Sequence, residues 1–297
     1  MKKGFKSGFV ALIGRPNAGK STFLNKMIGR KIAIISDKPQ TTRNKIVGVL
    51  TEAQFQVVFL DTPGIHKPLD QLGKIMVSTA LTTLREVDVI YYLVDASVPF
   101  GSGEAFIMER LSKVDTPIFL LLNKIDRLKK PDLLPLIDVY RRKREWTGIV
   151  PISALTGENM GSLLDSTVAY LPEGPQYYPS DMLTDQPEKI LVAELVREKI
   201  LWAMREEIPY SVAVTVEMME QRSAHLLYIG ATIFVERSSQ KAIIIGKNGE
   251  MLKTIGTLAR GELEGLLGNK VFLELWVKVK TNWRNSKRSI HALGYQN

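Results

Sequence analysis

Eight consecutive residues near the amino terminus have the composition of a phosphate-binding loop. They read Gly14-Arg15-Pro16-Asn17-Ala18-Gly19-Lys20-Ser21. Glycines at both ends permit the tight turn that aims backbone N–H groups at a phosphate, the lysine adds positive charge, and the serine hydroxyl can bind Mg²⁺. An apolar strand over 9–13 precedes the loop, and a helix from Thr22 to Ile28 follows it, so the positive end of the helix dipole faces the phosphates. The pattern predicts a nucleoside triphosphate site.

Two segments further along could complete a magnesium and γ-phosphate site. Residues 29–45 are polar and irregular and contain Pro39-Gln40-Thr41-Thr42-Arg43. A threonine hydroxyl there could reach the metal, although a plain surface loop is also compatible with this sequence. The strand over 56–60 ends in Asp61-Thr62-Pro63-Gly64. An aspartate in this place can hold Mg²⁺ through water, and the backbone N–H of Gly64 can bond to the γ-phosphate.

A third group of residues predicts which base is bound. Asn123-Lys124-Ile125-Asp126 follows an apolar run, and Asp126 can accept two hydrogen bonds from N1–H and the 2-amino group of guanine. Adenine offers neither donor, which disfavours an ATPase or a small-molecule kinase. We expect Asn123 to face the other edge of the base, the stem of Lys124 to lie over the ring, and Ser153-Ala154-Leu155 to contact guanine O6. The chain order of these motifs indicates a guanine-specific nucleotide hydrolase.

Two residues bear on how hydrolysis would proceed. Many signalling GTPases place a glutamine directly after the Asp-x-x-Gly motif to orient the attacking water, but here that residue is Ile65. We therefore expect slow hydrolysis, or a water held by other groups. The amide oxygen of Asn17, with backbone carbonyls of 29–42, could hold K⁺ in place of an arginine finger, while stabilising the turn is the other role open to it.

The elements that must position these residues predict an α/β fold. The runs over 89–95 and 117–123 are continuously apolar, as in a mostly parallel sheet with helices on both faces. A proline-rich stretch, 173–186, then reads as a linker. The charges divide accordingly, with a net charge of +8 in 1–172, −3 in 173–185 and +4 in 186–297.

The second half has the element order of a smaller α+β domain. A helix over 188–205, strands over 211–218 and 226–236, a helix, a Gly-x-x-Gly turn, a helix towards Leu267 and a last strand over 271–280 are expected. The turn belongs to the segment Ile245-Gly246-Lys247-Asn248-Gly249. Its glycines let a nucleic-acid backbone come close, and the apolar run over 243–245 would wall a groove for about four nucleotides.

The basic carboxyl-terminal segment has two possible roles. Lys278, Lys280 and Arg284 could contact phosphates, with Trp283 as a stacking ring. Alternatively, Trp283 packs inside its own domain and the basic residues are solvated. A protein- or membrane-docking second domain, with its positive charge placed on lipid headgroups, also stays open at this point.

The amino-acid composition limits the classes of protein and of functional site that the chain can belong to. The 297 residues are 45% hydrophobic and 24% charged, with a net charge of +9, which favours an ordinary globular protein with an anionic partner. The absence of cysteine excludes disulfides and thiol catalysis, and three scattered histidines predict no metal cluster. Neither a signal peptide nor a transmembrane run is recognisable, so a cytoplasmic location is expected.

Taken together, the motifs resemble the Era family of bacterial GTPases, which carry a C-terminal KH RNA-binding domain. The resemblance spans nearly the full length of the chain. It includes Glu194–Lys199, Arg205–Ser211 and 245–249 in addition to the five nucleotide motifs. It implies a P-loop GTPase domain over 1–172, a linker over 173–186 and a type II KH domain over 187–297.

The same resemblance implies a function. Members of the family hydrolyse GTP in 30S ribosomal subunit assembly, bind the 3′ end of 16S rRNA through the KH domain, and can associate peripherally with the inner face of the cell membrane. It also implies that Thr42 rather than Thr41 ligates Mg²⁺. We expect GTP to order the loops over 29–43 and 62–80, so that RNA access to the KH domain follows the nucleotide state.

Overall fold

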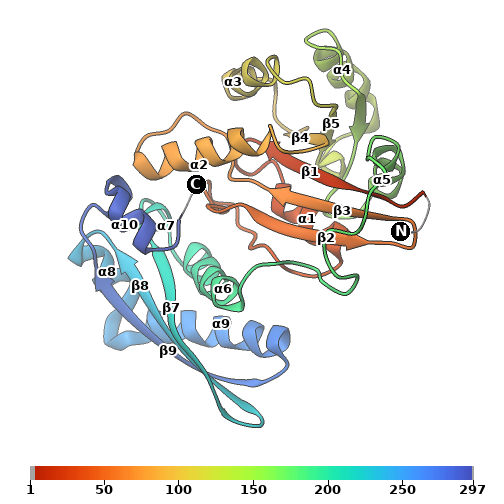
Figure 1. Cartoon of the computed structure of the whole chain (residues 1–297). Helices are drawn as coiled ribbons and strands as arrows, with labels where there is room; N and C mark the ends of the chain where they lie inside the picture. Colours follow the sequence, from red (N-terminus) through yellow and green to blue (C-terminus); the bar gives the residue numbers. More distant parts are fainter. Residues whose placement is uncertain (1–3, 296–297) are drawn as a thin grey trace.

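The computed structural model describes residues 4–295, and its first part is built on a six-stranded sheet (Figure 1). The elements of this part, in chain order, are β1 (Lys6–Gly14), α1 (Lys20–Ile28), β2 (Ile46–Thr51), β3 (Phe55–Asp61), α2 (Gln71–Thr83), β4 (Val89–Asp95), α3 (Ser102–Leu111), β5 (Ile118–Asn123), α4 (Lys130–Arg141), β6 (Gly148–Pro151) and α5 (Met160–Val168). The strand order is β2-β3-β1-β4-β5-β6. Only β2 runs antiparallel to its neighbour. The predicted mostly parallel α/β sheet is confirmed.

Helices bury both faces of this sheet. Leu12 on β1 packs with Phe23 on α1 and Leu163 on α5, whereas its neighbour Ile13 packs on the opposite face with Ile107 on α3. Helices α2 and α4 also lie on that second face. Because successive side chains of a strand point to opposite faces, a sheet covered twice requires the continuous apolar runs seen in the sequence. The nucleotide motifs follow β1, β3, β5 and β6, so parallel pairing brings them to one edge of the sheet.

Two local predictions for this part were incomplete or wrong. Strand β2 was not expected, because it directly follows an irregular polar segment and its pairing partner β3 supplies the context that makes it a strand. The loop expected over 62–80 ends at residue 70. Asp70 caps α2 by accepting a hydrogen bond from the backbone N–H of Gly73 at 2.7 Å, and Met76 and Ala80 bury the helix against the protein.

The second part is a three-stranded sheet with helices on one face. Its elements are α6 (Glu188–Ala203), α7 (Ile208–Ser211), β7 (Ala213–Ser223), β8 (Leu226–Val235), α8 (Ser238–Ile245), α9 (Glu250–Leu267), β9 (Lys270–Val279) and α10 (Lys287–Ala292). Strands β7 and β8 are antiparallel, and β8 and β9 are parallel. Val196 on α6, Ile244 on α8 and Ile255 on α9 share one core with Ile233 on β8. The expected element order is confirmed, with α7 and α10 as additions.

The segment between the two parts is held along the first sheet. Gln56 on β3 donates to the carbonyl oxygen of Tyr178 at 2.8 Å and accepts from the N–H of Tyr177 at 2.7 Å. The backbone N–H of Val49 on β2 donates to the carbonyl of Leu183 at 2.8 Å. The connection therefore follows the outer edge of the sheet before α6 begins.

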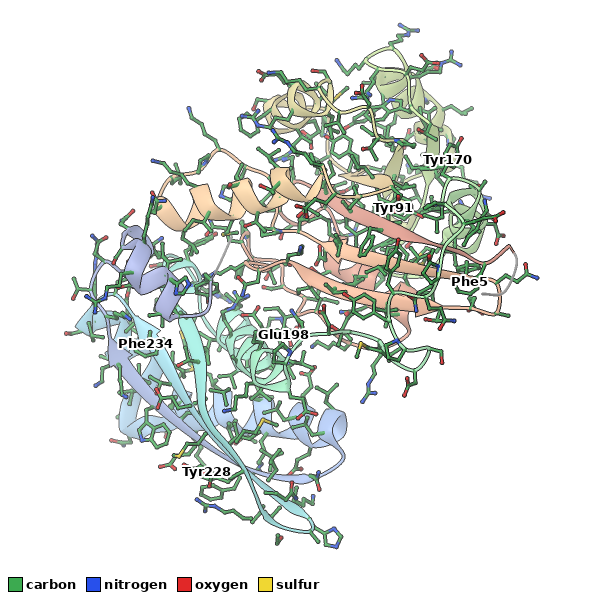
Figure 2. All side chains as sticks on the ribbon, viewed as in Figure 1. Phe5, Tyr91, Tyr170, Glu198, Tyr228 and Phe234 are labelled. Carbon is green, nitrogen blue, oxygen red and sulfur yellow. The ribbon has the colours of Figure 1, made fainter. Side chains whose placement is uncertain are left out.

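The second part contacts the first mainly through residues beside the nucleotide motifs. Figure 2 shows Glu198 on α6 at the boundary of the two parts, and its carboxylate accepts from the backbone N–H of Ile35 at 2.8 Å. Leu72 and Met76 of α2 share a cluster with Trp283 and Ile290 of the second part. Within residues 4–295, no helix is both long and apolar enough to cross a membrane.

Candidate nucleotide site and nucleic-acid surface

A cleft of about 540 Å³ opens at the edge of the sheet where the motifs meet. Among the predicted site residues, those that line it are Pro16, Asn17, Gly19, Lys20, Ser21, Thr22, Thr42, Gly64, Asn123, Lys124, Asp126, Ala154 and Leu155. The sequence did not single out Ile34, Ile35, Asp37, Asp95 and Arg127, which line it as well. A cleft of this size, bounded by the loops that follow parallel strands, suits a nucleotide.

Three oxygen-bearing side chains meet at one corner of the cleft. The Ser21 hydroxyl donates to Asp61 at 2.7 Å and lies 2.8 Å from the Thr42 hydroxyl, whereas the Thr41 hydroxyl turns away to the Lys38 carbonyl. The second carboxylate oxygen of Asp61 is buried and has no hydrogen-bond partner in the part of the chain that the structure describes. An orphaned carboxylate oxygen beside two hydroxyls is a donor set that fits Mg²⁺.

The charges at this corner are strongly perturbed by burial. Burial raises the pKa of Asp61 to about 6, against the opposing effects of Lys20 and of the two hydroxyls. Burial also lowers the pKa of Lys20, and the Asp61 carboxylate opposes that shift. The Lys20 ammonium group bonds to the carbonyl of Arg15 at 3.1 Å and to that of Gly14 at 3.4 Å. It thus lies across the loop, where an incoming phosphate can replace the carbonyls as its partner.

Gly64 lies directly against the phosphate loop. A Cβ atom at this position would come within 2.7 Å of the backbone nitrogen of Pro16. Only glycine permits this approach, which places the backbone of residue 64 at the wall of the cleft beside the phosphate loop. The predicted nucleotide-site residues that do not line the cleft are Gly14, Arg15, Ala18, Asp61, Thr62, Pro63 and Ser153. Arg15 points away to an ion pair with Glu104 at 3.0 Å.

The two residues expected to read the base, Asn123 and Asp126, are both held by hydrogen bonds to neighbouring segments. Asn123 is buried, donates to the carbonyl of Ala18 at 2.8 Å and accepts from the N–H of Ala154 at 2.9 Å. It ties the phosphate loop to the segment after β6 through one amide N–H and the amide oxygen, so the expected contact of Asn123 with the edge of the base stays a prediction for its second N–H. Asp126 is exposed and accepts from the Ser153 hydroxyl at 2.6 Å, which orients the carboxylate.

Asp95 is a site residue that the sequence analysis missed. Its carboxylate pairs with Lys124 at 2.6 Å and accepts from the Ser97 hydroxyl at 2.6 Å. Burial works against ionisation, but these hydrogen bonds from Lys124 and Ser97 hold the pKa of Asp95 below its ordinary value. The pair fixes the stem of Lys124 at the mouth of the cleft. The available signal was an acidic residue at the carboxyl end of β4, beside the base-reading strand.

The position directly after Gly64 is held by a buried apolar side chain. Ile65 is only 1% exposed and belongs to the core of the first part. The nearby ring of His66 contacts the carbonyl of Gly64 through Nδ1 at 2.8 Å and the amide of Gln40 through Nε2 at 3.2 Å. Asn17 donates to the carbonyl of Asp37 at 2.6 Å, which places its amide against the 29–42 loop.

The Gly-x-x-Gly turn projects from the second part between α8 and α9. Gly246 has φ +73° and Gly249 has φ +79°, which lie in the left-handed region that glycine adopts without strain. Lys247 and Asn248 are exposed at its tip. Of the apolar run before it, Ile243 is 50% exposed while Ile244 is fully buried in the core. Only part of the run can therefore wall a groove.

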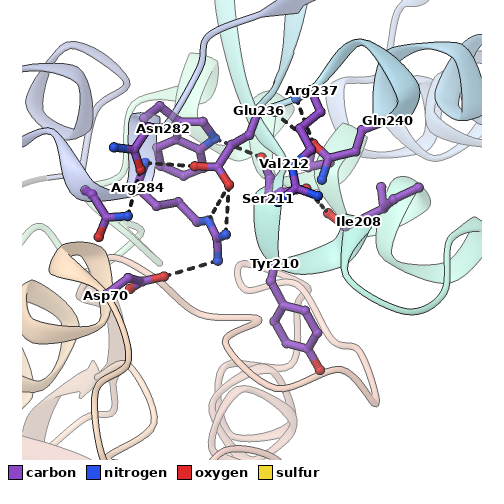
Figure 3. A network of polar contacts seen from close by, with 12 residues as sticks. Asp70, Ile208, Tyr210, Ser211, Val212, Glu236, Arg237, Gln240, Asn282 and Arg284 are labelled. Atoms are coloured by element: carbon purple, nitrogen blue, oxygen red, sulfur yellow. Dashed lines mark hydrogen bonds and ion pairs between the residues drawn. The ribbon is translucent and has the colours of Figure 1, made fainter.

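The remaining basic residues do not gather at this turn. Lys278 on β9 alternates with the inward-facing Val277, so it lies on the sheet face away from α8 and α9, as does Lys280. Arg284 binds Asp70 at 3.1 Å and Glu236 at 2.8 Å (Figure 3). Arg284 thus forms ion pairs with two carboxylates within the protein. Its expected contact with an RNA phosphate stays a prediction.

Trp283 is not a stacking platform for a base. Its ring is fully buried, and its Nε1–H donates to the carbonyl of Ser211 at 2.8 Å. The ring stacks on Tyr295 with the centroids 5.7 Å apart. Of the two roles that the sequence left open for Trp283, the structure therefore selects packing inside its own domain.

Comparison with known proteins agrees with this reading of both parts. Residues 9–124 match the family described as 50S ribosome-binding GTPase, and residues 207–284 match the KH domain family. The chain is 54% identical to GTPase Era of Alkaliphilus metalliredigens (strain QYMF) over 293 residues, which is 98% of this chain and 99% of the relative. Both matched regions therefore lie within the part of the chain that aligns with this one relative.

Two solved structures match over 99% of this chain and the whole of theirs. One is Era in complex with MgGDPNP and nucleotides 1506–1542 of 16S ribosomal RNA, with a TM-score of 0.96 and 44% identity. The other is a variant of Aquifex aeolicus Era bound to GDP and AlF₄⁻, with a TM-score of 0.95 and 44% identity. The similarity therefore extends to the arrangement of the two parts.

Proposed function

The chain belongs to the Era family of GTPases, and from this premise we propose that it couples GTP hydrolysis to RNA binding during assembly of the 30S ribosomal subunit. It hydrolyses GTP to GDP and phosphate. Its RNA partner is the 3′ end of 16S rRNA, the molecule that the structural relative was solved with. The observation that carries this function is the union, in one chain, of a guanine-nucleotide cleft with an exposed Gly-x-x-Gly turn.

Each domain and each group of site residues has its own role in this function. Residues 1–172 form the GTPase domain, 173–186 the linker and 187–297 the KH domain. Asp126 reads guanine, with Ser153 holding its carboxylate in place. Ser21, Thr42 and Asp61 hold Mg²⁺, which when bound neutralises charge on the β- and γ-phosphate oxygens. RNA contacts the segment 245–249 of the KH domain.

Hydrolysis in this site depends on position and charge rather than on a side-chain base. Lys20 bridges the β- and γ-phosphates, and the backbone N–H of Gly64 bonds to the γ-phosphate. Ile65 is buried and offers nothing to the attacking water. Intrinsic turnover is therefore slow.

A potassium ion between Asn17 and the 29–42 loop would supply further positive charge. In the structure the Asn17 amide donates to the Asp37 carbonyl, so the proposed ion requires the amide to turn and present its oxygen beside that carbonyl. At equal ionic strength we expect turnover to be roughly tenfold faster or more in KCl than in NaCl, as for the addition of one electrostatic contact in a transition state. The Asn17→Ala variant should lose that difference. Equal turnover of the unaltered protein in the two salts would exclude the ion.

RNA binding is tested with an oligonucleotide that copies the 16S rRNA 3′ end and with a scrambled control. With a GTP analogue we expect sequence-dependent binding that is tighter than with GDP. Changing Lys247 and Asn248 together to aspartate should weaken binding at least about tenfold and lower the salt slope by about one, because a phosphate contact is replaced by repulsion.

The same variant separates RNA from the other anionic partner. The basic charge of the protein also supports a peripheral, reversible association of this cytoplasmic GTPase with an acidic membrane surface. If the aspartate variant binds RNA normally, the turn is not the RNA site. If the protein binds neither oligonucleotide but sediments with anionic vesicles, the KH domain serves the membrane instead.

A further inference from the structure

The segment Thr41–Arg43 is held by the second domain from both sides. Thr42 lies in the metal corner, 2.8 Å from Ser21, whereas each of its two neighbours is bonded to the KH domain. Few segments of the chain combine a nucleotide-site side chain with contacts to the other domain at the adjacent positions. Because both neighbours are fixed by these contacts, the contacts restrict the position of the Thr42 hydroxyl.

On one side, an arginine of the KH domain reaches into the GTPase domain. Arg197 on α6 is fully buried, and its guanidinium donates to the backbone carbonyl of Thr41. Glu194, one turn earlier on the same helix, accepts from Arg197 Nε at 2.8 Å. The carboxylate fixes the guanidinium, so that a charge-assisted hydrogen bond is directed at the loop backbone.

On the other side, an arginine of the GTPase domain reaches into the KH domain. Arg43 is 2% exposed and donates to the carbonyls of Val212 at 2.6 Å, Tyr210 at 3.1 Å and Pro209 at 3.2 Å. Its guanidinium lies 5.7 Å from the ring of Trp283 and 5.5 Å from that of Tyr295. Across residues 4–295, no carboxylate forms an ion pair with it.

Such a pocket is specific for an arginine. A buried charge is costly unless it is hydrogen-bonded, and here three carbonyls at the α7 end bind the two terminal nitrogens of the guanidinium while two aromatic faces take the place of a counter-ion. Its Nε is buried and has no hydrogen-bond partner among the described residues. Lysine has a single ammonium group and no planar face, so it cannot make these contacts together. If the KH domain moves away, Arg43 loses all of them and Thr41 loses the Arg197 contact.

We propose that Arg43 and Arg197 form a reciprocal clamp that holds Thr42 at the metal site, so that the KH domain is a structural part of the GTP-bound state. This rests on the proposed role of Thr42 as a ligand of Mg²⁺. Both arginines are positioning residues, since neither reaches the nucleotide cleft itself. Because coupling between two sites is reciprocal, the seating of the KH domain and the binding of Mg²⁺ with GTP strengthen one another.

The clamp predicts a selective loss of triphosphate binding. In GTPases this loop contacts the metal when the γ-phosphate is present and is released after hydrolysis. In full-length Arg43→Lys and Arg197→Lys proteins, we therefore expect affinity for a non-hydrolysable GTP analogue to fall roughly 10-fold or more, as for the loss of a charged hydrogen bond. Affinity for GDP should change by less than about twofold. The Mg²⁺ concentration needed to retain the analogue should rise in parallel.

A matched control removes a neighbouring contact between the domains. Asn44→Ala loses the hydrogen bond from Asn44 to the carbonyl of Gly294, which measures 3.0 Å, and should leave both nucleotide affinities unchanged. An equal loss for GDP and the analogue, or no loss for either, would overturn the clamp. If the unaltered protein bound no guanine nucleotide, the assignment of the cleft would be wrong instead. A cooperative thermal unfolding transition shows that each variant is folded, so that an equal loss of both affinities is not the result of misfolding.

Discussion

Replacing Asp126 with asparagine is expected to lower the affinity for GTP on the order of 10³-fold, because two charge-assisted hydrogen bonds of roughly 1.5–3 kcal/mol each are lost. The amide group of the new side chain would offer an N–H donor where guanine also has a donor, whereas xanthine has a carbonyl at that place. The D126N protein should therefore prefer xanthosine triphosphate. Fluorescence titration with labelled forms of both nucleotides gives the two affinities.

The control for this exchange is Asp132→Asn. Asp132 is an exposed carboxylate in the first turn of α4, outside the cleft, so its loss should leave the affinity for GTP unchanged. The Ser153 hydroxyl, which donates to Asp126, can donate equally to the amide oxygen of asparagine and keep the side chain in place. A D126N protein that still prefers GTP over the xanthine nucleotide would show that another group reads the base.

Replacing Asp61 with asparagine is expected to change stability and activity in opposite directions. Burial raises the pKa of Asp61 to about 6, so at pH 7.5 the nucleotide-free protein carries a buried charge that the unfolded chain would expose to water. Removing that charge should raise the free energy of unfolding by about 2 to 3 kcal/mol. Hydrolysis should fall roughly 10- to 100-fold or more, since a group that orients the metal is lost.

The pH dependence distinguishes this cause from a general packing effect. The pKa is raised in the folded state, so protonation of Asp61 favours folding, and the unaltered protein gains stability from this group as the pH falls through 6. The advantage of Asp61→Asn should therefore shrink between pH 7.5 and pH 5. Denaturant unfolding without nucleotide or Mg²⁺ at both pH values measures it. A gain that is independent of pH would contradict the charge argument, and a variant with full Mg²⁺-dependent turnover would contradict the role of Asp61 at the metal.

The nucleotide site could be predicted well because its chemistry is local in sequence. Glycine, lysine and serine at fixed spacing form the phosphate loop wherever a strand leads into a helix, and parallel pairing then brings Asp61 and Asp126 to the same edge. The distinction between Thr41 and Thr42 came only from resemblance to a family. Spacing alone cannot say which of two adjacent hydroxyls turns inward.

What could not be predicted depends on contacts between distant segments. The hydrogen bonds of Asn123 to backbone groups of Ala18 and Ala154 join segments that lie far apart in the sequence. Strand β2 exists because β3 pairs with it. Arg43 reads in the sequence as one more surface charge, and only the arrangement of the domains provides the carbonyls and rings that bury it. To predict any of these contacts, one must know which distant segment of the chain packs against the residue or strand.

The tethering of the linker along the first sheet has a consequence for the energetics of the domain contact. Because the segment up to Leu183 is bonded to β2 and β3, only residues 184–187 separate a fixed point on the GTPase domain from α6. A tether this short sets an effective concentration on the order of millimolar or higher for the KH domain at its seat. An interface with a dissociation constant below that concentration is closed in this chain, even where it would be too weak to hold two separate molecules. A change of about 1.4 kcal/mol at the nucleotide shifts that equilibrium tenfold.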